Sequence, residues 1–247
     1  MWGLPALRGA RLRFVQSFAA HTPLHALVLA TIATVTALAV VVRRRRPPRP
    51  LTPGRFERAI GGGYLLLWIG TFTWLLFPPQ HDPPTTYPLQ LCHWAAAIAA
   101  LALLTGHRLW QTLAYFWGLA LCTQALATPN LSEGPAQWPF WFFWATHAMI
   151  VGVPVYEVCA RGYRPAWRDF RIACLLALGY VAVVLPINLA TGWNYGFVGS
   201  GTPGVPSIVD LLGPWPQRLA PIAGIAFVAM AALMLPWHFV RRGPPTS

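Results

Sequence analysis

The stretch LHALVLATIATVTALAVVVRRRR, residues 24–46, is a long apolar run that ends in four consecutive arginines. Its apolar part, residues 24–42, is close to the ~20 residues that a helix needs to cross the hydrocarbon core of a membrane. Basic residues directly after such a run favour the cytoplasmic side. No small-residue cleavage site follows the run, so we interpret it as an uncleaved transmembrane helix rather than a signal peptide.

The composition of the whole chain supports a membrane protein. Of the 247 residues, 56% are hydrophobic and only 10% are charged, and the mean hydropathy is +0.50. Soluble domains carry about 25% charged residues, so this composition excludes a soluble enzyme. We therefore expect an integral membrane protein.

Six further apolar runs have similar lengths. Together with the first they predict an all-α, polytopic membrane protein with seven transmembrane helices in a single domain. The predicted spans cover residues 24–42, 59–77, 87–104, 109–127, 138–160, 172–191 and 219–240. Residues 192–217 contain glycines and prolines that exclude an eighth span, so we expect an outer loop that forms an interfacial cap or a lid.

The arginines predict the orientation of the helices. All 18 basic residues are arginine, and the net charge is +12. Because they lie beside apolar runs, they indicate membrane orientation and contact with anionic lipids, and we expect no nucleic-acid partner. Four of them, at positions 8, 11, 13 and 218, fall on the side that the positive-inside rule makes the outer one. The N-terminus is then outside and the C-terminus cytoplasmic, in the cell membrane. The other arginines, on the cytoplasmic side, are at positions 43–46, 49, 55, 58, 108, 161, 164, 168, 171, 241 and 242.

Polar side chains gather in the outer half of the predicted bundle. Polar groups inside a membrane are costly, so they often mark functional sites. A thiol, imidazoles, amides and a carboxylate at similar depth are the components of a nucleophilic site. The residues are Cys92, His93, Gln124, His147 and Asn188 in the spans, and Asn194, Tyr195 and Asp210 in the outer loop.

Cys92 is the candidate nucleophile because a thiolate is accessible near neutral pH when a base assists it. His147 comes from another span and is the candidate base. His93 is the second candidate, although it follows Cys92 directly and neighbours on a helix point about 100° apart.

The amides and the loop residues are candidates for binding or orienting the substrate. Gln124 and Asn188 can hold an imidazole or an oxyanion, and they serve equally well as hydrogen bonds between helices. Asp210 can orient a histidine, and Asn194 and Tyr195 belong to the same outer loop.

Other polar residues have simpler interpretations. Cysteines in membrane helices are usually small packing residues, and we interpret Cys122, Cys159 and Cys174 in this way. We expect Glu157 to pair with a nearby arginine at the inner surface.

Metal and cofactor sites have little support in the sequence. A zinc site made of Cys92, His93 and His147 is weakly supported because closed zinc sites show tighter ligand spacing. The chain also lacks the H-E-x-x-H, C-x-x-C, P-loop and G-x-S-x-G motifs, so the corresponding enzyme classes have no motif. We expect no metal and no cofactor.

Several short motifs occur in an order that resembles a known family. They are Leu89–Cys92, Ala114–Leu119 followed by Gln124 and Thr128–Pro129, Phe143 with His147, Asn188 with Asn194–Tyr195, and Leu211–Pro216. Through them, roughly residues 54–240 resemble the YwaF-like bacterial integral membrane proteins, which are related to vertebrate transmembrane protein 164. The resemblance implies seven spans and, from the vertebrate members, a cysteine-dependent acyltransferase that acts on phospholipids.

The resemblance also implies roles for single residues. Cys92 would accept the acyl chain as a thioester, with His147 as its partner and membrane phospholipids as substrates. One position departs from the family: relatives often carry histidine where this chain has Gln90. If that histidine is the base in relatives, this chain would be impaired or would use His93 instead. A transporter or channel for a small or lipid-like solute, and a non-catalytic scaffold in the cell envelope, are the alternative functions.

Overall fold

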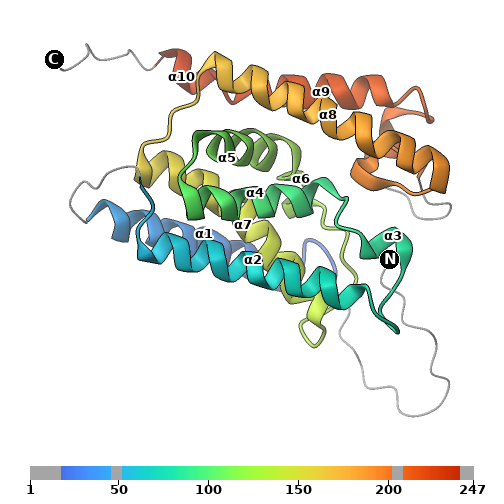
Figure 1. The fold of residues 1–247 in the computed structure, drawn as a ribbon, viewed down its shortest axis with the longest axis horizontal. Helices are drawn as coiled ribbons and strands as arrows, with labels where there is room; N and C mark the ends of the chain where they lie inside the picture. The colour runs from blue at the N-terminus through green and yellow to red at the C-terminus, as the bar shows by residue number, and fades with distance from the viewer. Residues whose placement is uncertain (1–17, 46–51, 202–207, 240–247) are drawn as a thin grey trace.

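The chain folds into a bundle of helices, as the computed structural model in Figure 1 shows. The structure describes residues 18–45, 52–201 and 208–239. Within these ranges the regular elements are helices and there is no strand, which confirms the predicted all-α class. Residue 240, residues 202–207 of the predicted outer loop and the arginines at positions 8, 11, 13, 46, 49, 241 and 242 lie outside the described residues.

Five helical stretches of the described chain are long and apolar enough to cross a membrane. Each of them contains most or all of one predicted span. They are α1 (Pro23–Arg44), Pro83–Thr105, which joins α3 (Pro83–Thr86) to α4 (Leu91–Thr105), α7 (Trp138–Arg161), α8 (Trp167–Thr191), and Leu219–Phe239, which joins α9 (Leu219–Ala232) to α10 (Leu235–Phe239).

The two other predicted spans are helical but do not meet this criterion. α2 (Arg55–Leu75) covers most of residues 59–77, and its glycines and threonines dilute its apolar character. Residues 109–127 are divided among α5 (Arg108–Leu113), the π-helical segment η1 (Ala114–Leu121) and α6 (Gln124–Ala127). The helices thus lie where the sequence predicts them, and length and composition support five crossings.

Local signals set where helices begin and end. The Thr22 hydroxyl accepts a hydrogen bond from the His25 N–H at 3.4 Å, and Pro23 occupies the first turn of α1. At their C-terminal ends, α4 and α7 stop at Gly106 and Gly162. The φ angles of these glycines, 64° and 77°, lie in the left-handed region that favours glycine. After the stop at Gly106 the chain reverses in a short turn, and α5 packs against α4.

α4 lies at the centre of the bundle, with α2, α7, α5 and η1 packed around it (Figure 1). Its alanines are buried and small, which lets neighbouring backbones approach closely. On α2, Gly61 faces the Ala100 carbonyl, and a methyl group on Gly61 would lie 2.6 Å from that oxygen. The small residues of α4 therefore set the distance between the helices around it.

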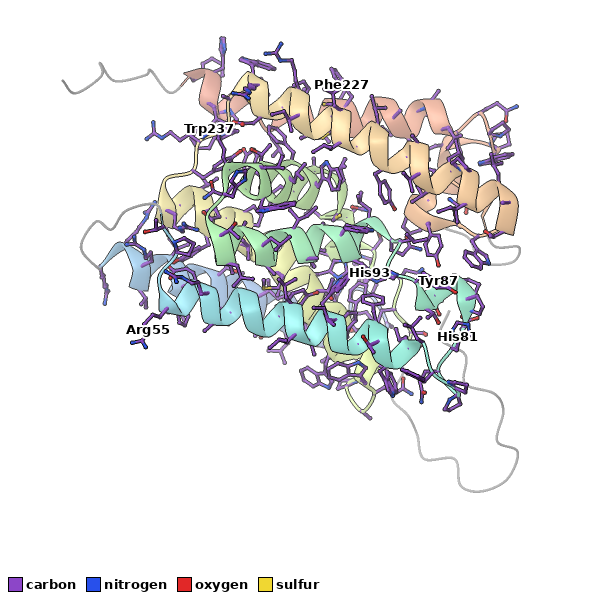
Figure 2. The ribbon with its side chains drawn as sticks, viewed as in Figure 1. Arg55, His81, Tyr87, His93, Phe227 and Trp237 are labelled. Carbon is purple, nitrogen blue, oxygen red and sulfur yellow. The ribbon has the colours of Figure 1, made fainter. Side chains whose placement is uncertain are left out.

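One end of the bundle is rich in arginine and held by ion pairs. Arg161 pairs with Glu157 at 2.5 Å, which confirms the predicted partner of that carboxylate. Arg108 pairs with Asp169 at 2.6 Å. We call this end, where α1 and α7 finish and α2, α5 and α8 begin, the arginine end. The opposite end, which carries α3 and residues 192–201, is the loop end. Figure 2 shows Arg55 and Trp237 toward the first, and His81 and Tyr87 at the second.

The outer faces of α1, α8 and α9 are apolar and exposed. Little of the apolar surface of these three helices is buried within the bundle. Apolar patches of this size do not occur on ordinary water-exposed surfaces, whereas they match lipid chains. Examples are Leu27, Val35 and Leu38 on α1, Leu175, Leu178 and Val183 on α8, and Ile225, Phe227 and Val228 on α9.

Candidate active site

Two thiols and an imidazole meet in the half of the bundle near the loop end. Cys92 lies in the first turn of α4, Cys122 directly follows η1, and His147 lies in the third turn of α7. Both cysteines belong to one apolar cluster. The Cys92 thiol lies near the Cys122 thiol and the His147 imidazole. We call these three residues the thiol cluster; it brings together the predicted nucleophile and the predicted base.

Hydrogen bonding fixes which nitrogen of His147 carries the proton. Nδ1 lies 2.7 Å from the carbonyl oxygen of Phe143. A carbonyl only accepts, so Nδ1 donates this bond, and Nε2 of the neutral ring keeps a free lone pair. Nε2 is buried and has no hydrogen bond of normal geometry, and the Cys92 thiol lies beside the ring. In the neutral ring, this tautomer leaves Nε2 as the nitrogen that can accept the thiol proton.

A close approach of two backbones brings η1 and α7 together at this point. A methyl group on Gly118 of η1 would lie 2.5 Å from the Ile150 carbonyl oxygen of α7. Ile150 lies about one turn after His147, and Cys122 about one turn after Gly118. Residues one turn apart share a helix face, so the contact between the two backbones places Cys122 near His147.

Two hydroxyl groups add to the polar surroundings of the thiol cluster. The hydroxyls of Tyr64 on α2 and Thr146 on α7 lie 2.9 Å apart, and both side chains are buried. Tyr64 belongs to the same apolar cluster as Cys122. The sequence offered no signal for either residue, because an isolated Tyr or Thr in an apolar run has no distinguishing pattern. Cys122, a predicted packing residue, also lies near the thiol of Cys92.

His93 is directed toward α2. Its ring packs against Phe72, with ring centroids 4.7 Å apart, and its carbonyl accepts a hydrogen bond from Trp68 Nε1 at 3.1 Å. Figure 2 shows His93 between α4 and α2. Its Nδ1 is buried and has no hydrogen-bond partner among the described residues. His93 thus occupies the interface between α2 and α4, as its position next to Cys92 on the helix predicts.

Gln90 fastens the outer loop to the start of α4. Its Oε1 accepts a hydrogen bond from the Gly196 N–H at 3.0 Å. Next to it, the Leu89 carbonyl accepts from the Tyr180 hydroxyl of α8 at 2.7 Å. Two neighbouring elements therefore hold the first turn of α4, which carries Cys92.

Asn188, Asn194 and Tyr195 shape the outer loop. Asn188 pairs with the backbone of Tyr195: its Nδ2 donates to the carbonyl and its Oδ1 accepts from the N–H, both at 2.9 Å. Asn194 Oδ1 accepts from the Gly199 N–H at 3.0 Å. Burial raises the pKa of Tyr195 to about 12, so its hydroxyl stays protonated and donates to the Pro83 carbonyl at 3.1 Å. These contacts are structural, and they belong to a cap over the loop end.

Asp210 and Gln124 do not have the surroundings that the sequence predicts. Asp210 forms an ion pair with Arg218, where we expected a histidine. Arg218 also donates to the Gly199 carbonyl at 3.0 Å, so it joins the two described parts of the loop. Gln124 is exposed, because the short helix α6 turns it away from the bundle interior.

The donor set of the site suits nucleophilic chemistry. Among residues 18–45, 52–201 and 208–239, no three His, Cys, Asp or Glu side chains are grouped as a metal ion would require. The thiol cluster contains a thiol near an imidazole, which are the two kinds of group that covalent catalysis by cysteine requires.

Comparison with protein families accounts for most of the chain. The model of the TMEM164 family matches residues 17–234. No curated protein and no solved structure is a match. The matched range includes the thiol cluster and the first turn of α4. Because it spans most of the 247 residues, this chain belongs to the TMEM164 family.

Proposed function

We propose that this chain is an integral membrane acyltransferase, which moves a fatty acyl chain between phospholipids and lysolipids through a thioester at Cys92. The observation that carries the proposal is the buried Nε2 of His147, which has a free lone pair beside the Cys92 thiol. A thiol next to such an acceptor is the arrangement of a cysteine nucleophile and its base. The resemblance to cysteine-dependent acyltransferases supports the same chemistry.

The reaction has two halves. In the first, the Cys92 proton moves to His147 Nε2, and the thiolate attacks the ester carbonyl of a phospholipid. The C–O bond breaks, the leaving alkoxide takes the proton from Nε2, and a lysophospholipid departs. In the second, an acceptor hydroxyl gives its proton to Nε2 and attacks the thioester. The C–S bond breaks, and Cys92 recovers its proton from Nε2, so that atoms and charges balance without a cofactor.

The position of the site fits a lipid substrate. Cys92 lies in the first turn of α4, near the loop end. If α4 crosses the membrane, this depth is where the polar ester groups of a phospholipid meet its acyl chains. The exposed apolar faces of α1, α8 and α9 support access from the lipid phase between helices.

The proposal includes the topology. We propose that α2 and the run α5–η1–α6 also cross, which gives seven spans, with the loop end outside and the arginine end in the cytoplasm of a bacterial cell. The positive-inside rule supports this orientation, since most of the described arginines belong to the arginine end. They include Arg43, Arg44, Arg55, Arg58, Arg108, Arg161, Arg164 and Arg168.

Mass spectrometry of the intact protein tests the chemistry. After incubation with phosphatidylcholine and phosphatidylethanolamine, we expect an acyl adduct that hydroxylamine removes and that Cys92→Ala abolishes. Cys159→Ala is the matched control, because Cys159 is an exposed thiol at the arginine end, and it should keep the adduct.

A folded wild-type protein that forms no adduct, even with an activated acyl donor, would contradict the proposal. Solute flux across liposomes that survives Cys92→Ser would then identify a transporter.

A further inference from the structure

Cys122 is a second thiol at the site that the proposed reaction does not use. Its side chain is fully buried, and it shares an apolar cluster with Cys92. Within this cluster the two thiols lie near each other, where η1 meets α4. The two cysteines come from separate helical segments and lie near a histidine with a free lone pair. Which thiol donates its proton, and to which atom, therefore decides what Cys122 does.

The hydrogen bonds give the contact a direction. His147 Nδ1 donates to the Phe143 carbonyl at 2.7 Å, so Nε2 is the nitrogen of the neutral ring that can accept the Cys92 proton. Once Cys92 donates to Nε2, its sulfur can only accept from a further neighbour. Cys122 has the S–H that fills this role.

The backbone carbonyls near Cys122 already accept other hydrogen bonds, so the Cys122 S–H is free to donate to the sulfur of Cys92. A cysteine in a helix commonly donates back to a carbonyl of the preceding turn. Here the Thr123 hydroxyl already donates to the carbonyls of Gly118 at 3.1 Å and Leu119 at 2.8 Å. The π-type bond from the Cys122 N–H to the Trp117 carbonyl, 3.1 Å long, ends η1 at the point where it meets α4 and α7.

We propose that Cys122 is a positioning residue whose S–H donates to the sulfur of Cys92 and holds the thiolate while His147 takes the proton. Cys122 keeps its own proton throughout, and no bond to it forms or breaks. Its role in acyl transfer rests on the proposed function, whereas the thiol–thiol hydrogen bond does not.

Two readouts test the proposal on the full-length protein. The first is the rate at which N-ethylmaleimide alkylates Cys92 at neutral pH, followed by peptide mass spectrometry. The second is the rate of acyl adduct formation. The variants are Cys122→Ala, which removes the donor, and Cys122→Ser, which keeps one. Cys174→Ala on α8 is the control for loss of a partly buried thiol elsewhere.

We expect Cys122→Ala to slow both reactions about tenfold, because hydrogen bonds to charged groups are worth about one to two powers of ten in an equilibrium. Cys122→Ser should restore most of both rates, and Cys174→Ala should change neither. A serine variant as slow as the alanine variant, with the same thermal stability, would reduce Cys122 to a packing role and overturn the proposal. So would an alanine variant with unchanged rates. If the alkylation pattern holds while the wild type forms no acyl adduct, the proposed function fails and the thiol pair stands.

Discussion

At the scale of single residues, the site depends on which histidine accepts the thiol proton. His147 has its free nitrogen beside Cys92, whereas His93 packs on Phe72. We expect His147→Gln to slow acyl adduct formation by about 100-fold or more, which is the usual contribution of a general base. His93→Gln should have a much smaller effect on the rate measured by intact mass spectrometry.

His81→Gln is the control for this comparison, because His81 lies in the exposed turn between α2 and α3. The reverse ranking, with His93→Gln slower than His147→Gln, would move the base to α4 and would contradict the assignment made from the hydrogen bonds.

The sequence predicted the central pair of the site but not its surroundings. Cys92 and His147 stood out because a thiol and an imidazole are rare and costly inside a membrane. Tyr64 and Thr146 could not be found, since their contact joins α2 to α7 across the bundle. Asn188 and Tyr195 are predicted as site residues because amides and phenols are polar, and the structure shows them hydrogen-bonded to each other in the outer loop.

At the scale of elements, the contact between η1 and α7 should control activity. A methyl group on Gly118 would press on the Ile150 carbonyl at 2.5 Å, and overpacking of this kind costs about 1–3 kcal/mol. We expect Gly118→Ala to lower the Tm in detergent and to reduce adduct formation more than the loss of folded protein explains. The reason is that the clash moves Cys122 and His147 apart.

Two matched glycine variants separate stability from site geometry. Gly61→Ala meets the Ala100 carbonyl at 2.6 Å, away from the thiol cluster, so it should lower the Tm while the remaining folded protein keeps its rate. Gly224→Ala on α9 meets no atom within 4 Å and should leave the Tm unchanged or slightly raised. Equal rates per folded molecule in Gly118→Ala and Gly61→Ala would contradict this account of η1.

At the scale of the whole molecule, the number of crossings is the main prediction. Arg55 and His81 mark opposite ends of the α2 segment (Figure 2), and His107 and Asn130 flank the run from α5 to α6. In a variant without native cysteines, a single cysteine at each position would be labelled with a membrane-impermeant maleimide in intact cells. We expect labelling at positions 81 and 130, and labelling at 55 and 107 only after permeabilisation. Labelling of both ends of one segment from outside would contradict its crossing.

Apolar run length predicted the long helices but could not count the crossings. α1, α8 and α9 face outward, and their apolar side chains make the pattern strong. α2 carries glycines where it packs against α4, and the run from α5 to α6 is divided into three short helical segments. Interior membrane helices are selected for close approach as well as for hydropathy, so the length of an apolar run does not by itself count the crossings.

The bond from His147 to Phe143 joins two residues of the same helix. The orientation of the imidazole is therefore set inside α7, independently of α4 and η1. Any sliding of α7 along its neighbours would change the gap between nitrogen and sulfur, but not which nitrogen carries the proton. Movement of α7 relative to α4 can thus make or break the contact between His147 and Cys92 while the tautomer of the imidazole stays the same.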